Sequence, residues 1–439
     1  MVEQSSPAGF GNHFETESVE GALPKDQNSP QKVPHGLYAE QLSGTPFTYA
    51  RHRNQRSWTY RIQPTVLHRP FKPVADQERF KNWLTIFDKD DSRLHISPAQ
   101  YRWRPQTIPT DKQVTFIEGI QTMGGAGGPA LKNGLGIHLY ACNKSMEKEA
   151  FYSSDGDLLI VPQVGEILVK TEFGRIYVEP QEIVVVQRGI KFQVELLEGQ
   201  ARGFICEIYK SHFVIPDLGP IGSNGMANPR DFQTPIAWYE DKHEEWTVIN
   251  KFQGSFFQYQ VTHSPFDIVA WHGNYAPYKY DLRKYNTIGS ISFDHPDPSI
   301  FTVLTAQTDD PGQAVCDFVI FPPRWLVQEH TFRPPYYHRN TMSEFMGNIQ
   351  GTYDAKESFC AGASSLHSTM SGHGPDAEVF DKASNADLKP QLVGVDSMSF
   401  MFETAYMLKL TDYAVNEENV YTDYHECWQK LPREFKAPQ

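Results

Sequence analysis

Residues 157–198 read DLLIVPQVGEILVKTEFGRIYVEPQEIVVVQRGIKFQVELLE, and this stretch decides the fold class. Short apolar runs dominated by Val, Ile, Phe and Tyr alternate with turn-forming residues, which are Pro162-Gln163, Gly165, Phe173-Gly174, Pro180-Gln181 and Arg188-Gly189. Residues of these apolar types favour strands, whereas a helix would need an uninterrupted window of roughly ten residues. The spacing therefore predicts an antiparallel β-sandwich or barrel built from short strands.

A second β-rich region begins near residue 287 and extends this prediction. Its apolar segments are TIGSISFDHPDPSIFTVLTA (287–306), CDFVIFPPRWLV (316–327) and MSFMFETAYMLKLT (398–411). We therefore expect a mainly β protein with few helices. The length of the chain and the positions of its turn-forming residues favour an irregular N-terminal arm over 1–35, a large β domain over 36–285 and a second β domain over 286–439.

Two other segments carry local predictions. In VYTDYHECWQKLPREF (420–435), side chains with apolar character recur every three or four residues, which favours a helix. The glycine-rich segment GIQTMGGAGGPALKNGLGIH (119–138) lacks the Gly-Lys-Ser/Thr of a phosphate-binding loop and the strand–helix setting of a dinucleotide fingerprint. We interpret it as a flexible loop between strands.

Composition limits which cellular compartment and which binding partners are expected. The chain has 439 residues and a formal net charge of −13, which argues against nucleic acid or an anionic membrane surface as a partner. The five cysteines are scattered and form no Cys-x-x-Cys pair. No basic, apolar leader and no bilayer-length apolar run is visible. These features favour a cytoplasmic protein with reduced thiols.

A candidate metal-binding pair lies in YYHRNTMSEF (336–345), where His338 and Glu344 are six residues apart. Six residues span roughly 20 Å in a strand, and in a helix they place two side chains on different sides. Both side chains can therefore bind one ion only if the chain turns between them. Asn340-Thr341 is the expected bend, followed by a return strand from Met342.

A second candidate pair lies in LHSTMSGHGPD (366–376), where His367 and His373 have the same spacing and Ser371-Gly372 permits a bend. One carboxylate and two imidazoles form the facial triad of non-haem Fe(II) oxygenases, although zinc can use the same ligands. The H-E-x-x-H zinc motif is absent, and neither segment contains a cysteine for a structural zinc or an iron–sulfur centre. Spacing alone leaves open which histidine completes the triad.

Longer strings carry a family resemblance. PPYYHRNTMSEFMG (334–347) and SLHSTMSGHGPD (365–376) resemble the iron-binding segments of the homogentisate 1,2-dioxygenase family. Other strings that resemble this family are GFGNHFETE near the N-terminus, LYAEQLSGTPFT (37–48), NQRSWTYRI (54–62), FDHPDPSIFTVLTA (293–306) and FVIFPPRW (318–325). The resemblance runs from the N-terminal arm to Trp428.

The resemblance implies a two-domain, cupin-like jelly-roll fold whose first domain is degenerate and holds no metal. It implies one Fe(II) per subunit in the second domain, bound by His338, Glu344 and His373, and a homohexamer built as a dimer of trimers. General cupins carry H-x-H followed by x3-E. Here Asn340 replaces the second histidine, a departure that matches the family.

The resemblance also assigns residues around the metal. His295, in FDHPDPS, matches the proton-accepting histidine of the family, a role that suits an imidazole because its pKa lies near working pH. Tyr353 and His373 are implied to contact the substrate, and His367 to lie beside the iron or against the substrate. Without the resemblance, His295 is a backbone-bonded loop residue and Tyr353 a core aromatic.

The implied activity is an Fe(II)-dependent cleavage of the homogentisate ring by O₂ to give 4-maleylacetoacetate, in tyrosine and phenylalanine catabolism. Arg333 and Arg51 could supply positive charge for the acetate group or could instead form surface ion pairs. Three other functions remain open: a dioxygenase for another dihydroxy-aromatic acid such as gentisate, a Zn or Mn cupin isomerase, and a non-catalytic bicupin. Asn340 counts against the isomerase, and the intact ligands count against the bicupin.

Overall fold

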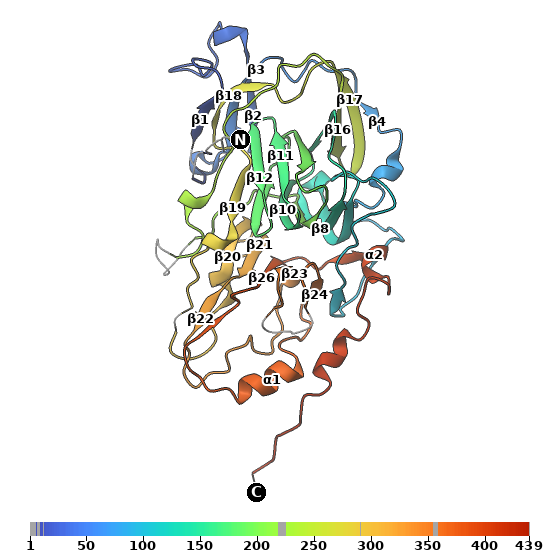
Figure 1. The fold of residues 1–439 in the computed structure, drawn as a ribbon, viewed down its shortest axis with the longest axis vertical. Helices are drawn as coiled ribbons and strands as arrows, with labels where there is room; N and C mark the ends of the chain where they lie inside the picture. The colour runs from blue at the N-terminus through green and yellow to red at the C-terminus, as the bar shows by residue number, and fades with distance from the viewer. Residues whose placement is uncertain are drawn as a thin grey trace.

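The computed structural model describes residues 6, 9–11, 13–217, 225–289, 291–353 and 359–438. These residues form stacked β-sheets with few short helices, which confirms the mainly β prediction (Figure 1). Most strands of the N-terminal half occupy the upper part of the view, and the strands that follow residue 300 occupy the lower part. The residues that form the candidate site come from the lower part.

An eight-stranded sheet forms the middle layer. Its strands, in spatial order, are β19 (Tyr278–Asp281), β13 (Glu182–Val186), β10 (Asp157–Val164), β15 (Ala201–Ile208), β8 (Asn133–Cys142), β7 (Ile120–Gly128), β27 (Lys409–Thr411) and β5 (Leu94–His95). Leu158 and Ile160 pack into one hydrophobic core, and Leu159 and Val161 into another. Because side chains alternate between faces, a sheet that is buried on both faces needs a continuous apolar run, which explains this part of the sequence.

Two outer layers cover the middle sheet. A seven-stranded sheet contains β12 (Gly174–Val178), β11 (Ile167–Thr171), β14 (Phe192–Leu196), β9 (Glu149–Ser153), β16 (Trp246–Phe252), β17 (Ser255–Val261) and β4 (Lys72–Pro73). A six-stranded sheet contains β20 (Thr302–Gln307), β21 (Ala314–Phe321), β26 (Met398–Thr404), β23 (Ser343–Gln350), β24 (Ser364–His367) and β6 (Tyr101–Trp103). The rings of Phe204 and Phe400, 4.9 Å apart, join this second sheet to the middle layer.

Two smaller sheets lie at the periphery. One contains β1 (Phe14–Glu17), β18 (Ile268–Gly273), β3 (Arg56–Arg61) and β2 (Tyr38–Ser43), and the other pairs β22 (Arg324–Leu326) with β25 (Gln391–Val393). The N-terminal arm is therefore not wholly irregular, because β1 pairs with β18. Residues 1–5, 7, 8 and 12 of the arm lie outside the described residues.

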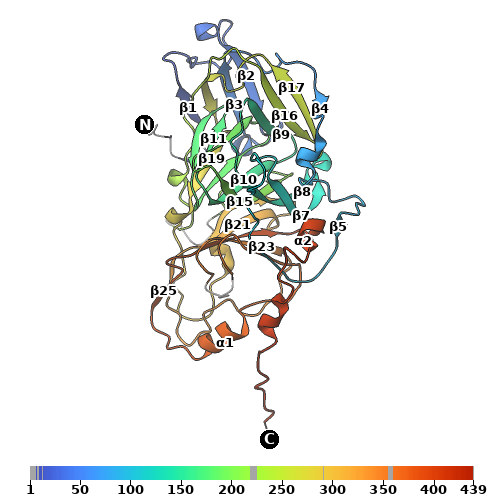
Figure 2. The same cartoon turned by 45° about the vertical axis from the view of Figure 1, so that its right-hand side comes forward.

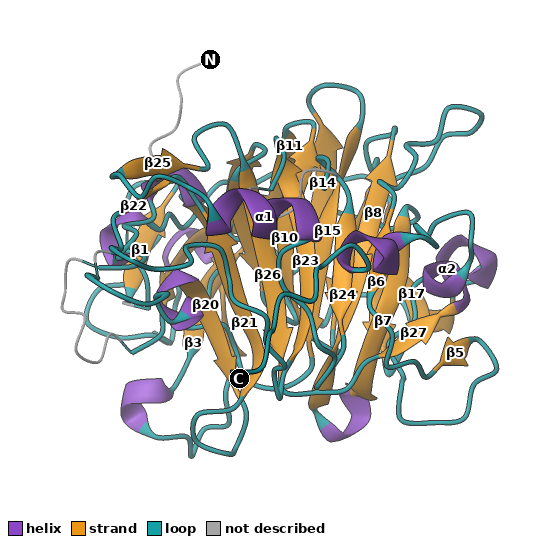
Figure 3. Cartoon of the chain, turned by 90° about the horizontal axis from the view of Figure 1, so that it is seen from below, coloured by secondary structure: helices purple, strands orange, loops and turns teal. Residues whose placement is uncertain are grey.

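Helices are short and lie outside the strand layers (Figure 3). The α-helices are α1 (Ala377–Ser384) and α2 (Asp412–Val415). The 3-10 helices are η1 (Pro34–Gly36), η2 (Arg51–Arg53), η3 (Gln77–Phe80), η4 (Pro129–Leu131), η5 (Pro229–Asp231), η6 (Leu282–Lys284), η7 (Pro298–Phe301) and η8 (Tyr424–Trp428). None of the helices in the described ranges has the length and hydropathy that crossing a bilayer requires.

The helix predicted over 420–435 is wrong except for η8. Pro432 disfavours helical geometry in the residue before it, and the spaced aromatic side chains serve tertiary contacts instead of one helix face. The strand predicted from residue 287 begins only at Thr302. Pro296 and Pro298 lack backbone donors, and the residues before Thr302 form loops and η7.

The prediction that the glycine-rich segment is a flexible loop is also wrong. This segment forms most of β7 and β8, a hairpin in the middle sheet. A Cβ atom on Gly125 would lie 2.3 Å from the Phe87 ring and 2.5 Å from the carbonyl oxygen of Leu135. Glycine is needed there because a ring and a neighbouring strand approach the backbone closely.

The two halves of the chain complete each other's sheets. β6, from the first half, pairs with β24 in the six-stranded sheet, and β27, near the C-terminus, pairs with β7. Figure 2 shows α2, which directly follows β27, beside β7 and β5. The domain limits at 35 and 285 stay predictions, but hydrogen bonds between strands cross the second limit. This exchange brings Arg102 in β6 beside the strand that ends in His367.

Candidate metal centre

Glu344 lies in β23 between two strands that carry polar partners. In the strand register it faces His367 of β24 on one side and Glu403 of β26 on the other. The Glu344 side chain is almost fully buried. A buried carboxylate needs charged or hydrogen-bonding partners, and both neighbouring strands supply them.

The chain does turn between His338 and Glu344, as the spacing argument required. The Asn340 side-chain oxygen accepts a hydrogen bond from the backbone N–H of Met342, which closes the turn that leads into β23. His338 forms an isolated antiparallel bridge with His373, with N–O distances of 3.0 and 3.1 Å. This bridge brings the two histidine segments together.

Three ligand atoms, from His338, Glu344 and His373, lie within 4.8 Å of one another. The Nδ1–H of His338 donates to the Tyr336 carbonyl (2.7 Å), and that of His373 donates to the Ser371 carbonyl (2.9 Å). Each Nε2 therefore points toward the Glu344 carboxylate. His338 Nε2 lies 3.6 Å from Oε1, and His373 Nε2 lies 2.9 Å from Oε2. Metal-binding histidines are commonly oriented in this way, by a hydrogen bond from the ring nitrogen that does not bind the metal.

The charges around Glu344 favour its ionised form. Burial alone would raise the pKa of the Glu344 carboxyl, but interactions with His338, His367 and His373 hold it well below its ordinary value. Interaction with Glu344 raises the pKa of His338, against the opposite effect of partial burial.

The donor set fits a divalent cation. With both Nδ1 atoms donating to carbonyls, each neutral histidine turns a lone pair toward the carboxylate. Nε2 of His373 and Oε2 of Glu344 are then both acceptors at 2.9 Å, so a proton or a cation must lie between them. Two imidazoles and a carboxylate match the ligand preference of Fe(II) and of zinc.

Asn340 is more than a missing ligand. Its side-chain amide donates to Glu344 Oε1 at 3.0 Å and to Glu403 Oε1 at 2.6 Å. It therefore ties two carboxylates together behind the triad. Burial, followed by the charge of Glu344, raises the pKa of Glu403 to about 7.

His367 lies beside the triad but outside the group of converging ligand atoms. Its ring stacks on that of His373, with centroids 4.1 Å apart and an angle of 10° between the planes. Its Nδ1 is 3.7 Å from Glu344 Oε2, and its Nε2 is 3.0 Å from the hydroxyl of Tyr424.

A cavity of about 510 Å³ opens over the triad. Its wall is largely apolar and includes Phe301, Phe321, Pro335, Met342, Met346 and Met401. Such a volume is within the usual range for small-molecule sites. His295, Tyr353 and His367 also line it, so the residues that the family resemblance assigned to the site all border this cavity.

Arg333 and Arg51, which the sequence left open as partners of an acetate group or of surface ion pairs, do not line the cavity. Arg333 is buried and donates to the carbonyls of Gln328 and Lys389, and Arg51 lies in the exposed η2. The arginines on the cavity wall are Arg324 and Arg339.

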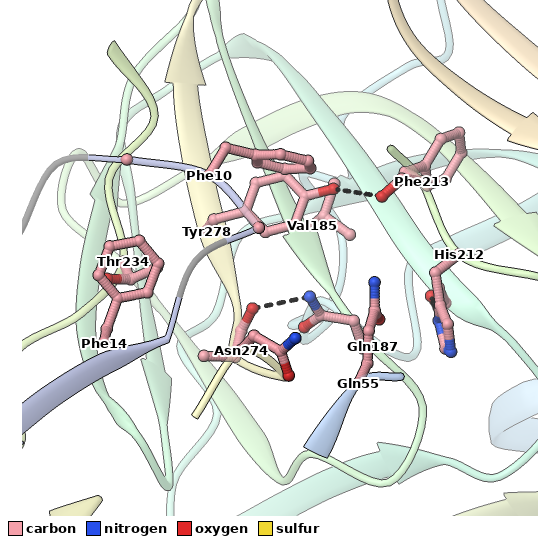
Figure 4. Close-up of a pocket in the computed structure, with 14 residues that line it drawn as sticks. Phe10, Phe14, Gln55, Val185, Gln187, His212, Phe213, Thr234, Asn274 and Tyr278 are labelled. Carbon is pink, nitrogen blue, oxygen red and sulfur yellow. Dashed lines mark hydrogen bonds and ion pairs between the residues drawn. The ribbon is translucent and has the colours of Figure 1, made fainter. Parts of the chain in front are cut away.

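A separate small cavity, of about 30 Å³, lies under the N-terminal arm (Figure 4). Phe10, His212 and Tyr278 are among its lining residues, and no triad residue reaches it. His212 is tied to Asp157 and to the Gly44 carbonyl. These contacts stabilise the fold.

Glu403, Arg324 and Arg339 were missed as site residues. One signal for Glu403 was present in MSFMFETAY, where an acidic residue shares the strand face of Met401 and lies opposite the apolar face of Phe400 and Phe402. Which strand that face meets depends on sheet register, and a single sequence does not reveal register.

Some solved structures share a weak likeness with this chain. A mutant of Bacillus subtilis oxalate decarboxylase is 10% identical with a TM-score of 0.29, covering 73% of this chain and 81% of its own. A cupin 2 conserved barrel domain protein from Leptotrichia buccalis is 8% identical with a TM-score of 0.24, covering 69% and 92%. These TM-scores are too low to carry an argument.

Sequence comparison is decisive. The family model for the N-terminal part of homogentisate 1,2-dioxygenase matches residues 6–282, and the model for its C-terminal part matches residues 283–435. A homogentisate 1,2-dioxygenase from Caenorhabditis elegans is 56% identical over 434 residues, which is 98% of each chain. The chain belongs to the homogentisate 1,2-dioxygenase family.

Proposed function

We propose that this chain is an Fe(II)-dependent dioxygenase that uses O₂ to cleave the aromatic ring of homogentisate to 4-maleylacetoacetate, in tyrosine and phenylalanine catabolism. The observation that carries the proposal is the convergence of His338, Glu344 and His373 beneath an apolar-walled cavity. Family membership supports the substrate, and the donor set is that of Fe(II) oxygenases.

His338, Glu344 and His373 would hold the iron. Fe(II), when bound, would supply the redox chemistry between the ring and O₂, while the protein supplies geometry and proton transfer. Asn340 leaves the position of a fourth cupin ligand without an imidazole, which keeps room for substrate. His373 borders the cavity as well, and we expect it to contact the substrate.

His295 is proposed to accept the phenolic proton of the substrate. Its Nδ1–H donates to the Pro296 carbonyl at 2.7 Å, which places the basic lone pair on Nε2. Its ring stands edge-on to that of Tyr336, which in turn contacts the ring of His338. His295 is therefore supported close to the proposed iron ligands without being one of them.

Tyr353 and His367 are proposed to contact the substrate. Tyr353 is buried against Phe321 and Phe359, and it lines the cavity. A buried tyrosine combines a ring that packs with an aromatic substrate and a hydroxyl that can orient it. His367, whose ring stacks on that of His373, lines the same cavity.

The direct test is anaerobic reconstitution with Fe(II), followed by measurement of O₂ uptake with homogentisate and identification of the product. Bound iron without O₂ uptake would contradict the proposal. Gentisate is the matched substrate, because it is also a dihydroxy-aromatic acid. Faster turnover of gentisate would indicate that gentisate is the substrate. Activity with Zn or Mn alone would favour a cupin isomerase.

The oligomeric state and the compartment follow the resemblance. We infer a cytoplasmic homohexamer, built as a dimer of trimers. Exposed apolar side chains support assembly: Trp325 and Leu392 are cross-strand partners in the β22–β25 sheet and are 59% and 42% exposed. Among the described residues, no disulfide links any of the five cysteines. Light scattering coupled to gel filtration measures the mass of the assembly.

A further inference from the structure

The C-terminal segment contacts the second histidine-bearing segment of the metal centre, residues 366–376, at two points. From η8, the Tyr424 hydroxyl lies 3.0 Å from Nε2 of His367. Four residues later, the indole N–H of Trp428 donates to the carbonyl of Gly374 at 3.2 Å, and Gly374 directly follows His373. The rings of Tyr424 and Trp428 also contact each other, with centroids 5.1 Å apart. One short segment therefore fixes two neighbouring parts of the site.

His367 transmits this contact to the proposed ligands. Its ring lies parallel to that of His373 at 4.1 Å, and its Nδ1 faces Glu344 Oε2 at 3.7 Å. A shift or rotation of the His367 ring would therefore disturb two of the three residues that converge on the metal position. The surrounding packing leaves little freedom, because His367 is 2% exposed.

Arg102 supports Tyr424 from the other side. Its guanidinium carbon lies 4.3 Å from the centroid of the Tyr424 ring, a cation–π arrangement. Arg102 comes from β6, the strand that the first half of the chain adds to the six-stranded sheet, and it is paired there with Ser365. The tyrosine is thus held between a buried arginine and His367.

We propose that Tyr424 is a positioning residue of the metal centre, whose hydroxyl donates to Nε2 of His367 and holds that ring against His373 and Glu344. This inference rests on the proposed function of the triad. A neutral imidazole has one N–H, so a hydrogen bond donated to Nε2 selects the tautomer with its N–H on Nδ1, facing the carboxylate. Burial raises the pKa of Tyr424 above its ordinary value, so the hydroxyl keeps its proton.

The chain contains a matched control for this arrangement. Tyr421 lies three residues before Tyr424, and the guanidinium carbon of Arg104 lies 4.4 Å from its ring centroid. Both tyrosines therefore pack under an arginine from the same neighbourhood of β6. The Tyr421 backbone bonds to Arg102 and Tyr424, whereas the contact described for its ring is with Arg104 and not with the triad. Removing each hydroxyl separates a role in the metal centre from general packing.

The test compares the full-length protein with its Tyr424→Phe and Tyr421→Phe variants. Fe(II) affinity is measured anaerobically by competition with a chelator, and the Fe(II)–nitrosyl complex is examined by electron paramagnetic resonance. We expect Tyr424→Phe to bind Fe(II) roughly tenfold more weakly, the lower end of the loss when a group that supports the metal ligands is removed. We also expect an altered nitrosyl spectrum. Tyr421→Phe should match the unchanged protein in both measurements.

The inference is overturned if Tyr424→Phe matches the unchanged protein in affinity and spectrum. It is equally overturned if both variants lose affinity together with thermal stability, because that result indicates packing alone. If Tyr424→Phe does not fold, Arg102→Lys and Arg104→Lys provide the same comparison.

The outcome is distinguishable from failure of the proposed function. If the unchanged protein turns over homogentisate and Tyr424→Phe changes neither the Fe(II) affinity nor the nitrosyl spectrum, only the positioning role is rejected. Iron binding that responds to Tyr424→Phe, without O₂ uptake by the unchanged protein, would reject only the proposed reaction.

Discussion

Glu344 and Glu403 face each other across neighbouring strands, and the Asn340 amide donates a hydrogen bond to each carboxylate. The two groups have opposite protonation behaviour. Three histidines keep the pKa of Glu344 low despite its burial, whereas burial and the charge of Glu344 raise the pKa of Glu403 to about 7. The metal-free site thus carries one carboxylate that stays ionised and one that titrates near neutral pH.

We expect Glu403→Gln to stabilise the metal-free protein at pH 8 more than at pH 5. In the unfolded chain the Glu403 carboxyl has its ordinary pKa of about 4.5, but in the folded protein its pKa is about 7. Ionisation therefore penalises the folded state as pH rises through this window, by roughly 3 kcal/mol at about 1.4 kcal/mol per pKa unit. Glutamine removes that penalty and can still accept from Asn340.

Denaturant unfolding of the metal-free protein and the Glu403→Gln variant at both pH values measures the effect. An equal difference in the free energy of unfolding at pH 5 and pH 8 would show that Glu403 does not titrate in this window.

His373→Ala and His367→Ala should separate a ligand from its neighbour. We expect His373→Ala to abolish stoichiometric Fe(II) binding, because it removes one of the three converging atoms. His367→Ala should retain iron with reduced affinity, because it removes only a ring that stacks on His373 and lies near Glu344. Iron content after anaerobic loading and desalting measures both. Iron retained by His373→Ala and lost by His367→Ala would reverse the assignment.

His295→Ala should impair proton transfer without emptying the metal site. We expect kcat/KM for homogentisate to fall by roughly 10²-fold, the lower range for loss of a general base. Part of the loss should be recovered as pH rises, because the phenolic substrate then loses its proton to solvent. Oxygen-electrode assays between about pH 6 and 9, with iron content as the control, test this. A pH-independent loss would speak against His295 as the proton acceptor.

The sequence was most informative where local rules decide structure. Turn residues between apolar runs identified all five strands over 157–198. It misled in the glycine-rich segment, because Phe87, far away in the chain, is what makes Gly125 part of a packed strand. The Tyr424–His367 contact joins positions 57 residues apart. Local patterns contain no such pairing information, and the family resemblance supplied the site residues that spacing left open.

Gly125→Ala tests why glycines occupy β7. The added Cβ would meet the Phe87 ring at 2.3 Å and the Leu135 carbonyl oxygen at 2.5 Å. We expect a loss of roughly 1–3 kcal/mol in the free energy of unfolding, as for other overpacked cores. Gly289→Ala is the matched control, because its Cβ would have no atom within 4 Å. Denaturant unfolding of both variants measures the costs, and similar costs would contradict the packing explanation.

Asp157→Asn should make stability less dependent on acid pH. Asp157 lines the small cavity under the N-terminal arm, where Arg188 donates to Oδ1 and His212 donates to Oδ2. Burial alone would raise the pKa of Asp157, but these two partners lower it to about 2. A depressed carboxyl pKa stabilises the folded protein above the unfolded pKa near 3.8, and this contribution is lost as pH falls toward 2.

The lowered pKa corresponds to roughly 2 kcal/mol at pH 7, about half of which should be gone by pH 3. The cost of Asp157→Asn should therefore shrink by about 1 kcal/mol between those pH values. Asp412→Asn is the control, because Asp412 pairs with His95 at the surface, where ion pairs contribute little. Unfolding free energies measured at both pH values decide the matter. A cost of Asp157→Asn that stays constant with pH would mean that its buried ion pairs do not set its titration.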